Sequence, residues 1–198
     1  MIAVLTKLNN VKGSFADFGF GSGKLSNQAY QQMKNGLLTK RDFHIYSNTE
    51  GFRDLSSYDV TMKSGESKGT KGRAIDIFHQ VKQHLKKEST VSFGSTDSIA
   101  ELPQGKIAIA IIQSVAFKDA DYLINLVWPK ITNRGVLILP GYSKHLAIKK
   151  VVEFFIKRNS SKFDFDVVSS EDFSYIIKKE KKKVLGYKLV REKSTSLF

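Results

Sequence analysis

The sequence contains no cysteine, only three prolines and a single tryptophan among its 198 residues. Without cysteine the chain can form no disulfide bond, no thiolate metal site and no cysteine nucleophile. Acidic residues are also scarce, because 19 Asp and Glu stand against 32 Lys and Arg, for a formal net charge of +13. No apolar run is long enough to cross a bilayer, and the first residues lack the features of a signal peptide. We therefore expect a cytoplasmic protein without a transmembrane segment.

The composition that remains is typical of a single globular domain. Hydrophobic residues make up 41% of the chain and aromatic residues 11%, which is enough for a packed core. No internal repeat and no linker divides the chain, so we expect one domain over residues 1–198. The excess of positive charge favours a polyanionic partner, or it serves only to keep the surface soluble, and both interpretations stay open.

The most informative stretch runs from Phe15 to Lys24. A short apolar run containing Asp17 is followed by glycines at alternate positions, and a helical pattern begins directly afterwards. A strand that turns sharply into a helix needs glycine where the backbone takes a positive φ or lies close to a ligand. The first amides of that helix also favour a bound anion or nucleotide. The pattern therefore predicts a cradle for a nucleotide-like ligand, and the alternative is a plain glycine-rich turn.

Strand-like and helix-like segments alternate along the rest of the chain. Strands are predicted at residues 15–18, 43–46, 91–93, 107–112 and 136–139, and an antiparallel hairpin at residues 163–167 and 175–177. Helices are predicted at residues 2–8, 25–37, 75–85, 119–128 and 143–155, the last capped by Ser143. This alternation predicts an α/β fold with a parallel sheet, whose ligand lies at the carboxyl ends of the strands.

Four segments, in a consistent order, resemble a known family. Residues 17–23 (Asp-Phe-Gly-Phe-Gly-Ser-Gly) resemble motif I of the class I S-adenosylmethionine-dependent methyltransferases. Residues 45–52, 106–113 and 128–142 resemble the macrocin O-methyltransferase group in particular. The resemblance implies a Rossmann-like fold, with a mostly parallel sheet, helices on both faces and a C-terminal antiparallel hairpin. It also implies S-adenosylmethionine as cofactor, bound by Asp17, Gly19, Phe20, Gly21, Gly23, Ser47, Asn48, Ser95, Thr96, Asp97 and Gln113.

The chain departs from the family at two kinds of position. Where the family binds the cofactor ribose through an acidic residue, this chain has Ser47, with Asn48 or Glu50 as substitutes. The family's metal-binding Asp positions correspond to Gln113, Val115, Pro140 and Gly141, none of which offers a carboxylate. We therefore expect no metal. Asp119 and Asp121, nearby in sequence, are expected to be solvated charges at the start of a helix.

No motif identifies a catalytic residue. His145, close to the end of the fifth strand, is the best-placed candidate for a general base. Tyr142 and Lys144 beside it suit a small or anionic substrate. His44 is expected in the core, and His79 and His84 on a helix surface.

A second feature is the cluster Lys178–Lys183, in which five lysines surround Glu180. It is either a solvated hairpin tip or a contact for nucleic acid or another polyanion. Three functions therefore remain open: a metal-independent methyltransferase acting on a small hydroxylated or sugar-like substrate, a non-catalytic relative that serves as a binding partner or scaffold, and a nucleic-acid-directed methyltransferase or binder. The oligomeric state is not indicated.

Overall fold

A computed structural model describes eight segments of the chain, residues 5–19, 24–47, 57–59, 91–95, 103–114, 116–142, 144–169 and 173–180. At positions 47, 93–95, 164–169, 173, 174 and 180 the backbone alone is described. The predicted helix at residues 75–85 and the lysines at 181–183 lie outside these segments.

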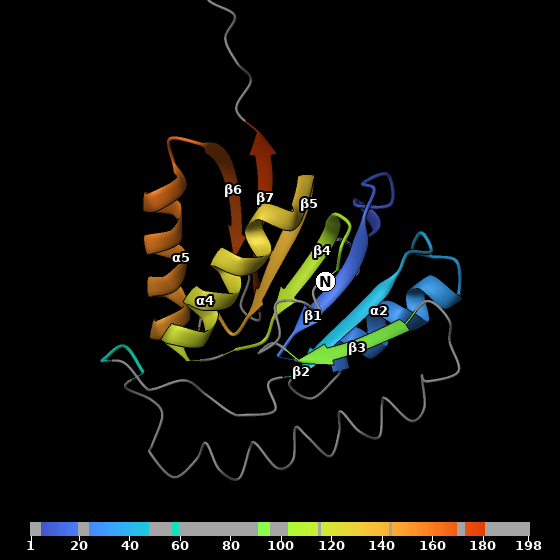
Figure 1. Cartoon of the computed structure of the whole chain (residues 1–198), viewed down its shortest axis with the longest axis horizontal. Helices are drawn as coiled ribbons and strands as arrows, with labels where there is room; N and C mark the ends of the chain where they lie inside the picture. The colour runs from blue at the N-terminus through green and yellow to red at the C-terminus, as the bar shows by residue number, and fades with distance from the viewer. Residues whose placement is uncertain are drawn as a thin grey trace, which may run out of the picture.

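The described strands form one seven-stranded sheet in the order β3-β2-β1-β4-β5-β7-β6 (Figure 1). The strands are β1 Ser14–Phe18, β2 Phe43–Ser47, β3 Val91–Ser95, β4 Ile107–Ile112, β5 Ile131–Pro140, β6 Phe163–Ser169 and β7 Phe173–Glu180. The first five run parallel, and β7 pairs antiparallel with both β5 and β6. The predicted fold class, with its C-terminal antiparallel hairpin, is confirmed.

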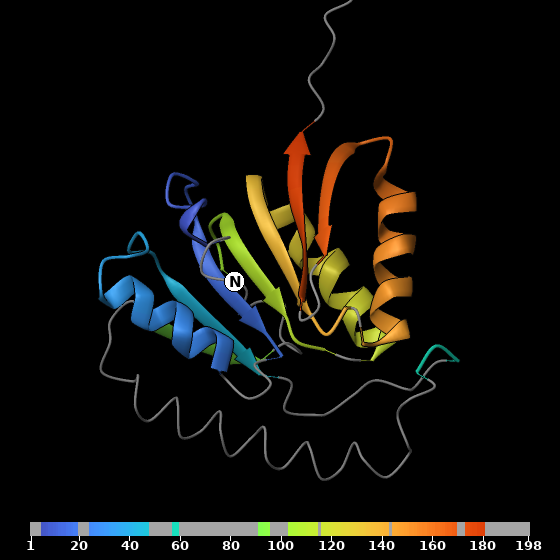
Figure 2. The same cartoon turned by 180° about the vertical axis from the view of Figure 1, so that it is seen from behind.

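Helices cover both faces of this sheet, as comparison of Figures 1 and 2 shows. Helices α4 (Phe117–Val127) and α5 (Leu146–Asn159) lie on one face, and α2 (Lys24–Lys34) lies on the other. Within the described residues, no helix is of the length and apolarity needed to cross a membrane.

Two hydrophobic cores, one on each face, follow from the alternation of side chains along the strands. In β1, Phe15 enters the core beneath α2 and stacks on Phe43 with ring centroids 4.2 Å apart. Phe18 is three residues further along the strand, so it points to the opposite face and enters the core beneath α4 and α5. The same core holds Trp128, whose ring meets Phe155 edge-on at 5.0 Å. A strand buried on both faces reads as a continuous apolar run, which explains Ile107–Ile112.

The fifth strand is longer than predicted because it contains an irregularity. Ile107 pairs with Ile131 but Ile109 pairs with Val136, so β5 holds extra residues at this point. Arg134 lies there with a φ of 67°, and a Cβ on Gly135 would come within 3.0 Å of the backbone oxygen of Ala108. Small size at residue 135 therefore lets the bulge pack against β4.

Two predictions about helix ends need correction. Helix α4 begins at Phe117 and continues into a 3-10 turn, Trp128–Lys130, so Pro129 lies inside a final turn instead of ending the helix before it. Helix α5 is capped at His145, without a side-chain hydrogen bond, and not at Ser143.

Lys178 does not belong to a surface cluster. Its side chain is 5% exposed, and its ammonium donates hydrogen bonds to the backbone oxygens of Trp128 (3.2 Å) and Ile131 (2.8 Å). The Nζ atom also lies 5.4 Å and 5.0 Å from the ring centres of Trp128 and Phe163. The structure describes two lysines of this stretch, and of these two Lys179 is the exposed one.

Candidate active site

A buried carboxylate joins three elements at the carboxyl end of β1. Asp17 is fully buried, and its two carboxylate oxygens accept hydrogen bonds from Nε2 of Gln113 at 2.9 Å and 2.7 Å. The hydroxyl of Ser26, in the first turn of α2, donates to the same carboxylate. Because Gln113 directly follows β4, this network ties together β1, β4 and the start of α2. Hydrogen bonds to an ionised carboxylate are stronger than neutral ones, and they offset part of the cost of burying the charge.

The turn that follows β1 requires glycine at its first position. Gly19 has a φ of +93°, in the left-handed region that other residues rarely adopt. Its amide donates to the backbone oxygen of Tyr46, and the amide of Gln113 donates to the backbone oxygen of Phe18. A Cβ at Gly19 would lie 3.4 Å from the Gln113 backbone. These bonds fix the end of β1 and Gly19 to β2 and β4.

The structure brings together some of the predicted cofactor-binding residues. Asp17, Gly19 and Gln113 lie in one cluster. The backbones of Ser47 and Ser95 pair with each other at the ends of β2 and β3, on the same edge of the sheet. Five parallel strands therefore end on the rim where a ligand was expected. The remaining predicted residues lie outside the described segments: Phe20, Gly21, Gly23, Asn48, Thr96 and Asp97.

A short segment that the sequence analysis did not single out lies against the start of α4. The carboxylate of Asp59 accepts a hydrogen bond from the backbone amide of Phe117 at 2.8 Å, and Asp59 is buried. The ring of Tyr58 lies 4.9 Å from that of Phe117 and 6.0 Å from that of Phe154. Asp59 thus satisfies an amide at the N-terminus of α4 from a remote position. No local periodicity marks such a contact, and an aspartate in a polar segment was the only available signal.

His145 lies at the end of β5, beside the turn that leads into α5. Gly141 has a φ of +75°, and a Cβ there would lie 2.7 Å from Cδ2 of His145. The amide of His145 donates to the backbone oxygen of Gly141 at 3.0 Å. The imidazole therefore packs directly on the turn, half-buried, on the rim shared with Gln113.

The carboxylates near this rim are committed to other contacts or placed in the interior. Asp119 is 3% exposed, so its predicted position in solvent was wrong. Asp121 accepts a hydrogen bond from Arg158 of α5 at 2.5 Å, which makes it part of a helix–helix ion pair. Among the described residues, no group of three or more His, Asp or Glu side chains could hold a metal ion. Since hard cations are bound by carboxylate oxygens, the residues that end β4 and β5 do not fit such an ion.

Solved structures that superpose on this chain identify its fold. The O-methyltransferase NovP superposes with a TM-score of 0.68 at 14% identity, over 91% of this chain and 78% of NovP. The fold is that of a class I S-adenosylmethionine-dependent methyltransferase. The calicheamicin methyltransferase CalS11 superposes at 0.59 with 15% identity, over 88% of this chain and 76% of its own. SMU.1697c of Streptococcus mutans, solved in complex with SAH, superposes at 0.56 with 15% identity, over 89% and 94%.

Similarity to other sequences adds nothing to this likeness of fold. No family model matches the sequence, and no curated protein matches it significantly. In a methyltransferase fold the strand, turn and helix around Gly19 occupy the first β–α junction, where the central strands meet. The buried carboxylate of Asp17 and the positive-φ glycine at the end of β1 fit a nucleotide-like cofactor at this end of the sheet.

Proposed function

We propose that the protein binds S-adenosylmethionine and transfers its methyl group to an oxygen of a small hydroxylated or sugar-like acceptor, without a metal ion. The observation that carries this proposal is the Asp17–Gln113–Ser26 network beneath the Gly19 turn, at the carboxyl ends of the parallel strands. The methyltransferases NovP and CalS11, which share the fold, support the reaction class.

The charge of the network suits the cofactor. S-adenosylmethionine, when bound, supplies a methyl group on a positively charged sulfur, and it also carries an ammonium group. Asp17 places a buried negative charge directly beneath the turn. In a site of low dielectric constant such a charge stabilises a nearby cation more strongly than it would in water. Asp17 therefore both ties the end of β1 to Gln113 and Ser26 and favours a cationic ligand.

We assign the acceptor to the part of the rim formed by the ends of β4 and β5. There His145 would accept the proton of the acceptor hydroxyl, and bound S-adenosylmethionine would supply the methyl group. Methyl transfer of this kind depends chiefly on proximity and alignment, which the hydrogen bond from the amide of His145 to the backbone oxygen of Gly141 favours. Lys144 beside it favours an acceptor with an anionic group.

Metal independence rests on the residues that end β4 and β5. The amide of Gln113 is hydrogen-bonded to Asp17, and Pro140 and Gly141 have no side-chain oxygen. Resemblance to the macrocin O-methyltransferase group remains a proposal made on the sequence segments alone. It supports a sugar-like acceptor.

Isothermal titration with S-adenosylmethionine and with S-adenosylhomocysteine tests the cofactor site. Wild-type protein should bind both, and Asp17→Asn should weaken both by about tenfold or more, because a charge-assisted contact is lost. Asp121→Asn, which removes the same charge from the α4–α5 ion pair, is the matched control and should leave both affinities within about twofold. Failure of the wild type to bind either compound would contradict the proposal and favour the non-catalytic alternative.

A second proposal is that the C-terminal lysines contact a polyanion. Lys178 takes no part in this contact, because its ammonium is buried. The remaining lysines, Lys179 and residues 181–183, are the groups through which nucleic acid would bind. Salt-dependent binding of an RNA oligonucleotide that disappears when these lysines become Gln would support this contact.

A further inference from the structure

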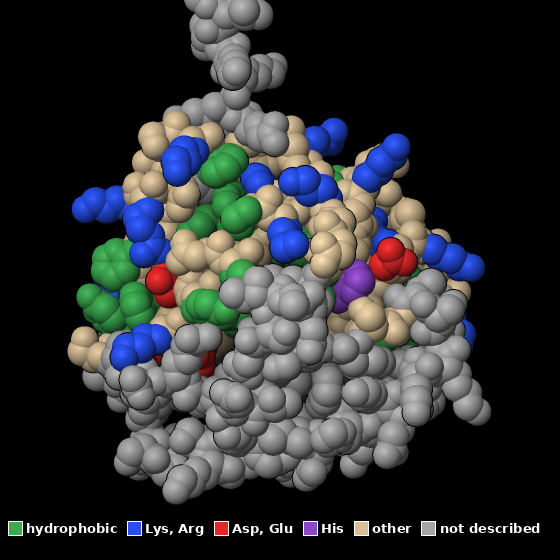
Figure 3. Space-filling model, in the orientation of Figure 1, with side chains coloured by type: hydrophobic (Ala, Val, Ile, Leu, Met, Phe, Trp, Pro, Cys, Tyr) green, Lys and Arg blue, Asp and Glu red, His purple; other side chains and the backbone are tan. Residues whose placement is uncertain are grey.

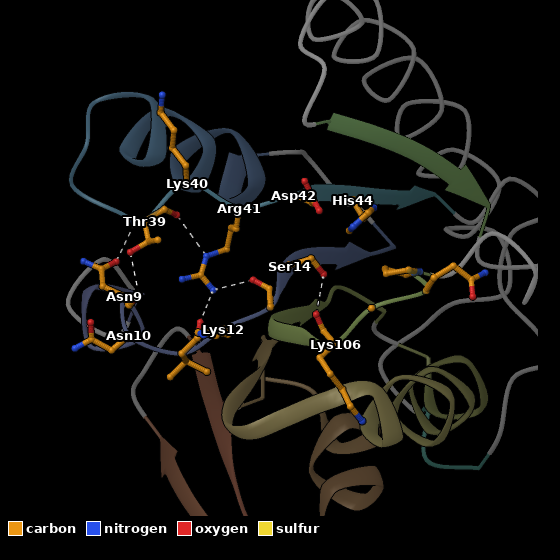
Figure 4. Close-up of a pocket in the computed structure, with 15 residues that line it drawn as sticks. Asn9, Asn10, Lys12, Ser14, Thr39, Lys40, Arg41, Asp42, His44 and Lys106 are labelled. Atoms are coloured by element: carbon orange, nitrogen blue, oxygen red, sulfur yellow. Dashed lines mark hydrogen bonds between the residues drawn. The ribbon is translucent and has the colours of Figure 1, made fainter.

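A cavity lies at the edge of the sheet opposite the candidate active site. Its volume is about 900 Å³, and it is formed by the turns that precede β1, β2 and β4 (Figure 4). Because these strands begin there, the cavity is separated from the Gly19 turn by the length of the strands. Its volume lies in the range of sites that bind small molecules.

The cavity wall is held by a network of hydrogen bonds. The guanidinium of Arg41 donates to the backbone oxygens of Leu8, Val11, Gly13 and Thr39. The backbone amide of Thr39 donates to the side-chain oxygen of Asn9, and the hydroxyl of Thr39 donates to the backbone oxygen of Asn9, both at 3.0 Å. The turns before β1 and β2 are therefore fixed to each other, and the cavity is preformed.

The charges that line the cavity are unbalanced. Lys12, Lys40, Arg41 and Lys106 line it, against one carboxylate, Asp42. Within the described part of the chain none of the four cations forms an ion pair, and the hydrogen bonds of Arg41 go to neutral backbone oxygens.

A histidine on the cavity wall does not alter this balance near neutral pH. Burial lowers the pKa of His44, and the nearby charge of Asp42 offsets this only in part. The ring is therefore mainly neutral at pH 7. The cavity thus offers several positive charges and one negative charge, together with neutral side-chain amides and hydroxyls, to a bound group.

We propose that this cavity binds a small phosphorylated compound, at a site separate from the one where methyl transfer takes place. A phosphate group would supply the missing negative charge, and Lys and Arg are the side chains that bind it. Lys40 and Lys106 extend in opposite directions from the two sides of the cavity (Figure 4). Both are exposed, so their long side chains can fold over a bound anion.

The placement of the charges favours a compact ligand over a nucleic-acid strand. A strand of RNA needs a groove or stripe that follows successive phosphates. Here the cations lie around a cavity bounded by three turns. On the face in Figure 3 the Lys and Arg side chains are scattered and form no continuous stripe. The site therefore has the form of a pocket for one ligand.

The test uses inorganic tripolyphosphate as the probe, titrated into the full chain by calorimetry in a phosphate-free buffer. Wild-type protein should bind it, and the triple variant Lys12→Gln, Lys40→Gln, Lys106→Gln should bind it at least about tenfold more weakly, because charge-assisted contacts are lost. The three lysines are exposed, so the variant should keep the melting temperature of the wild type within a few degrees.

The matched control changes the same net charge elsewhere. In Lys149→Gln, Lys157→Gln, Lys162→Gln the lysines lie on or just after α5, away from the cavity, and affinity for tripolyphosphate should stay within about twofold of wild type. Equal loss in both triple variants would show a general charge effect and overturn the proposal. Amide shifts in the NMR spectrum of wild-type protein should centre on residues 9–14 and 39–42.

Two further measurements test whether the cavity is separate from the cofactor site and whether its phosphate belongs to a small compound or to RNA. Tripolyphosphate should still bind when S-adenosylhomocysteine saturates the other site, and mutually exclusive binding of the two compounds would overturn the separation of the two sites. A single-stranded RNA oligonucleotide should bind the wild type and the cavity variant equally, because any RNA contact is assigned to the C-terminal lysines. If RNA binds, tripolyphosphate does not, and the cavity variant abolishes RNA binding, the pocket belongs to nucleic acid and the proposal of a small ligand is wrong.

Discussion

The carboxylate of Asp17 accepts two hydrogen bonds from the side-chain amide nitrogen of Gln113, at 2.9 Å and 2.7 Å, across the boundary between β1 and β4. This pair links the strand that precedes the glycine-rich turn to the strand whose end faces the proposed acceptor. The fully buried carboxylate receives much of its stabilisation from this amide and from Ser26. Removal of the amide should therefore affect both stability and the proposed cofactor site at the end of β1.

The first prediction concerns Gln113→Leu. This variant should lower the free energy of unfolding by about 1–3 kcal/mol, because the buried carboxylate loses two hydrogen bonds. It should also weaken S-adenosylmethionine binding. Gln31→Leu, at an exposed position of α2, is the control and should change neither property appreciably. Urea unfolding and calorimetry measure the two effects, and equal effects from the two variants would contradict a special role for Gln113.

The second prediction separates backbone strain from cofactor binding. Gly19→Ala and Gly36→Ala both place a Cβ at a positive φ, +93° and +76°. Each should cost about 1–2 kcal/mol of unfolding free energy. Only Gly19 lies at the proposed site, since a Cβ at Gly36, after α2, meets nothing within 4 Å. Calorimetry should show weaker cofactor binding for Gly19→Ala alone, and an equal loss for both would mean that the turn acts only through stability.

The order of strands and helices could be predicted because each strand has a recognisable local sequence pattern. A strand covered on both faces, such as Ile107–Ile112, must be apolar at every position. The turn at Gly19 is marked by glycine because only glycine adopts that backbone without strain. These are local requirements, and they identify the fold without knowledge of the partners.

Contacts between remote polar groups could not be predicted in the same way. Asp119 was expected in solvent because an acidic residue in the first turn of a helix is favourable there, yet tertiary packing buries it. Asp59 reaches the start of α4 from far away in sequence, which no local period encodes. For Lys178 a signal existed: it follows Ile176 by two residues, so both lie on the same, buried face of β7. The run of lysines after it concealed that alternation.

The third prediction tests the role of Lys178. Lys178→Met keeps the length of the side chain but leaves the backbone oxygens of Trp128 and Ile131 without their ammonium donor. The free energy of unfolding should fall by about 1–3 kcal/mol. Lys179→Met changes the exposed neighbour and should cost less than about 0.5 kcal/mol. A stabilising effect of Lys178→Met would show that burial of the charge costs more than its hydrogen bonds return.

The fourth prediction concerns the pH dependence of stability. Burial lowers the pKa of His44 below its ordinary value of 6.5, although the charge of Asp42 partly raises it again. A lowered folded-state pKa means that the unfolded chain takes up the proton first as the pH falls. The contribution of His44 is therefore fully present above pH 6.5 and is lost as the pH drops through the folded-state value.

Urea unfolding at neutral and mildly acidic pH measures this dependence. His44→Gln should reduce the loss of stability on acidification relative to wild type. Asp42→Asn should increase that loss, because it removes the charge that favours the protonated ring. Opposite signs for the two variants are the expected pattern, and identical pH profiles for all three proteins would contradict it.

The fifth prediction concerns metal ions. A divalent cation at the acceptor would hold the acceptor oxygen and lower its pKa, and it would need carboxylate ligands at the ends of β4 and β5. Gln113 provides a neutral amide that is bound to Asp17, Pro140 and Gly141 provide no side-chain oxygen, and Asp121 is paired with Arg158. Methyl transfer, once an acceptor is found, should therefore keep its rate in EDTA, and calorimetry with Mg²⁺ should show no tight site.

The variant Gln113→Asp supplies the missing carboxylate but places it against Asp17, so it should lower activity instead of creating metal dependence. Activity that is lost in EDTA and restored by Mg²⁺ in the wild type would overturn the assignment and point to Asp119, the buried carboxylate of α4, as a ligand.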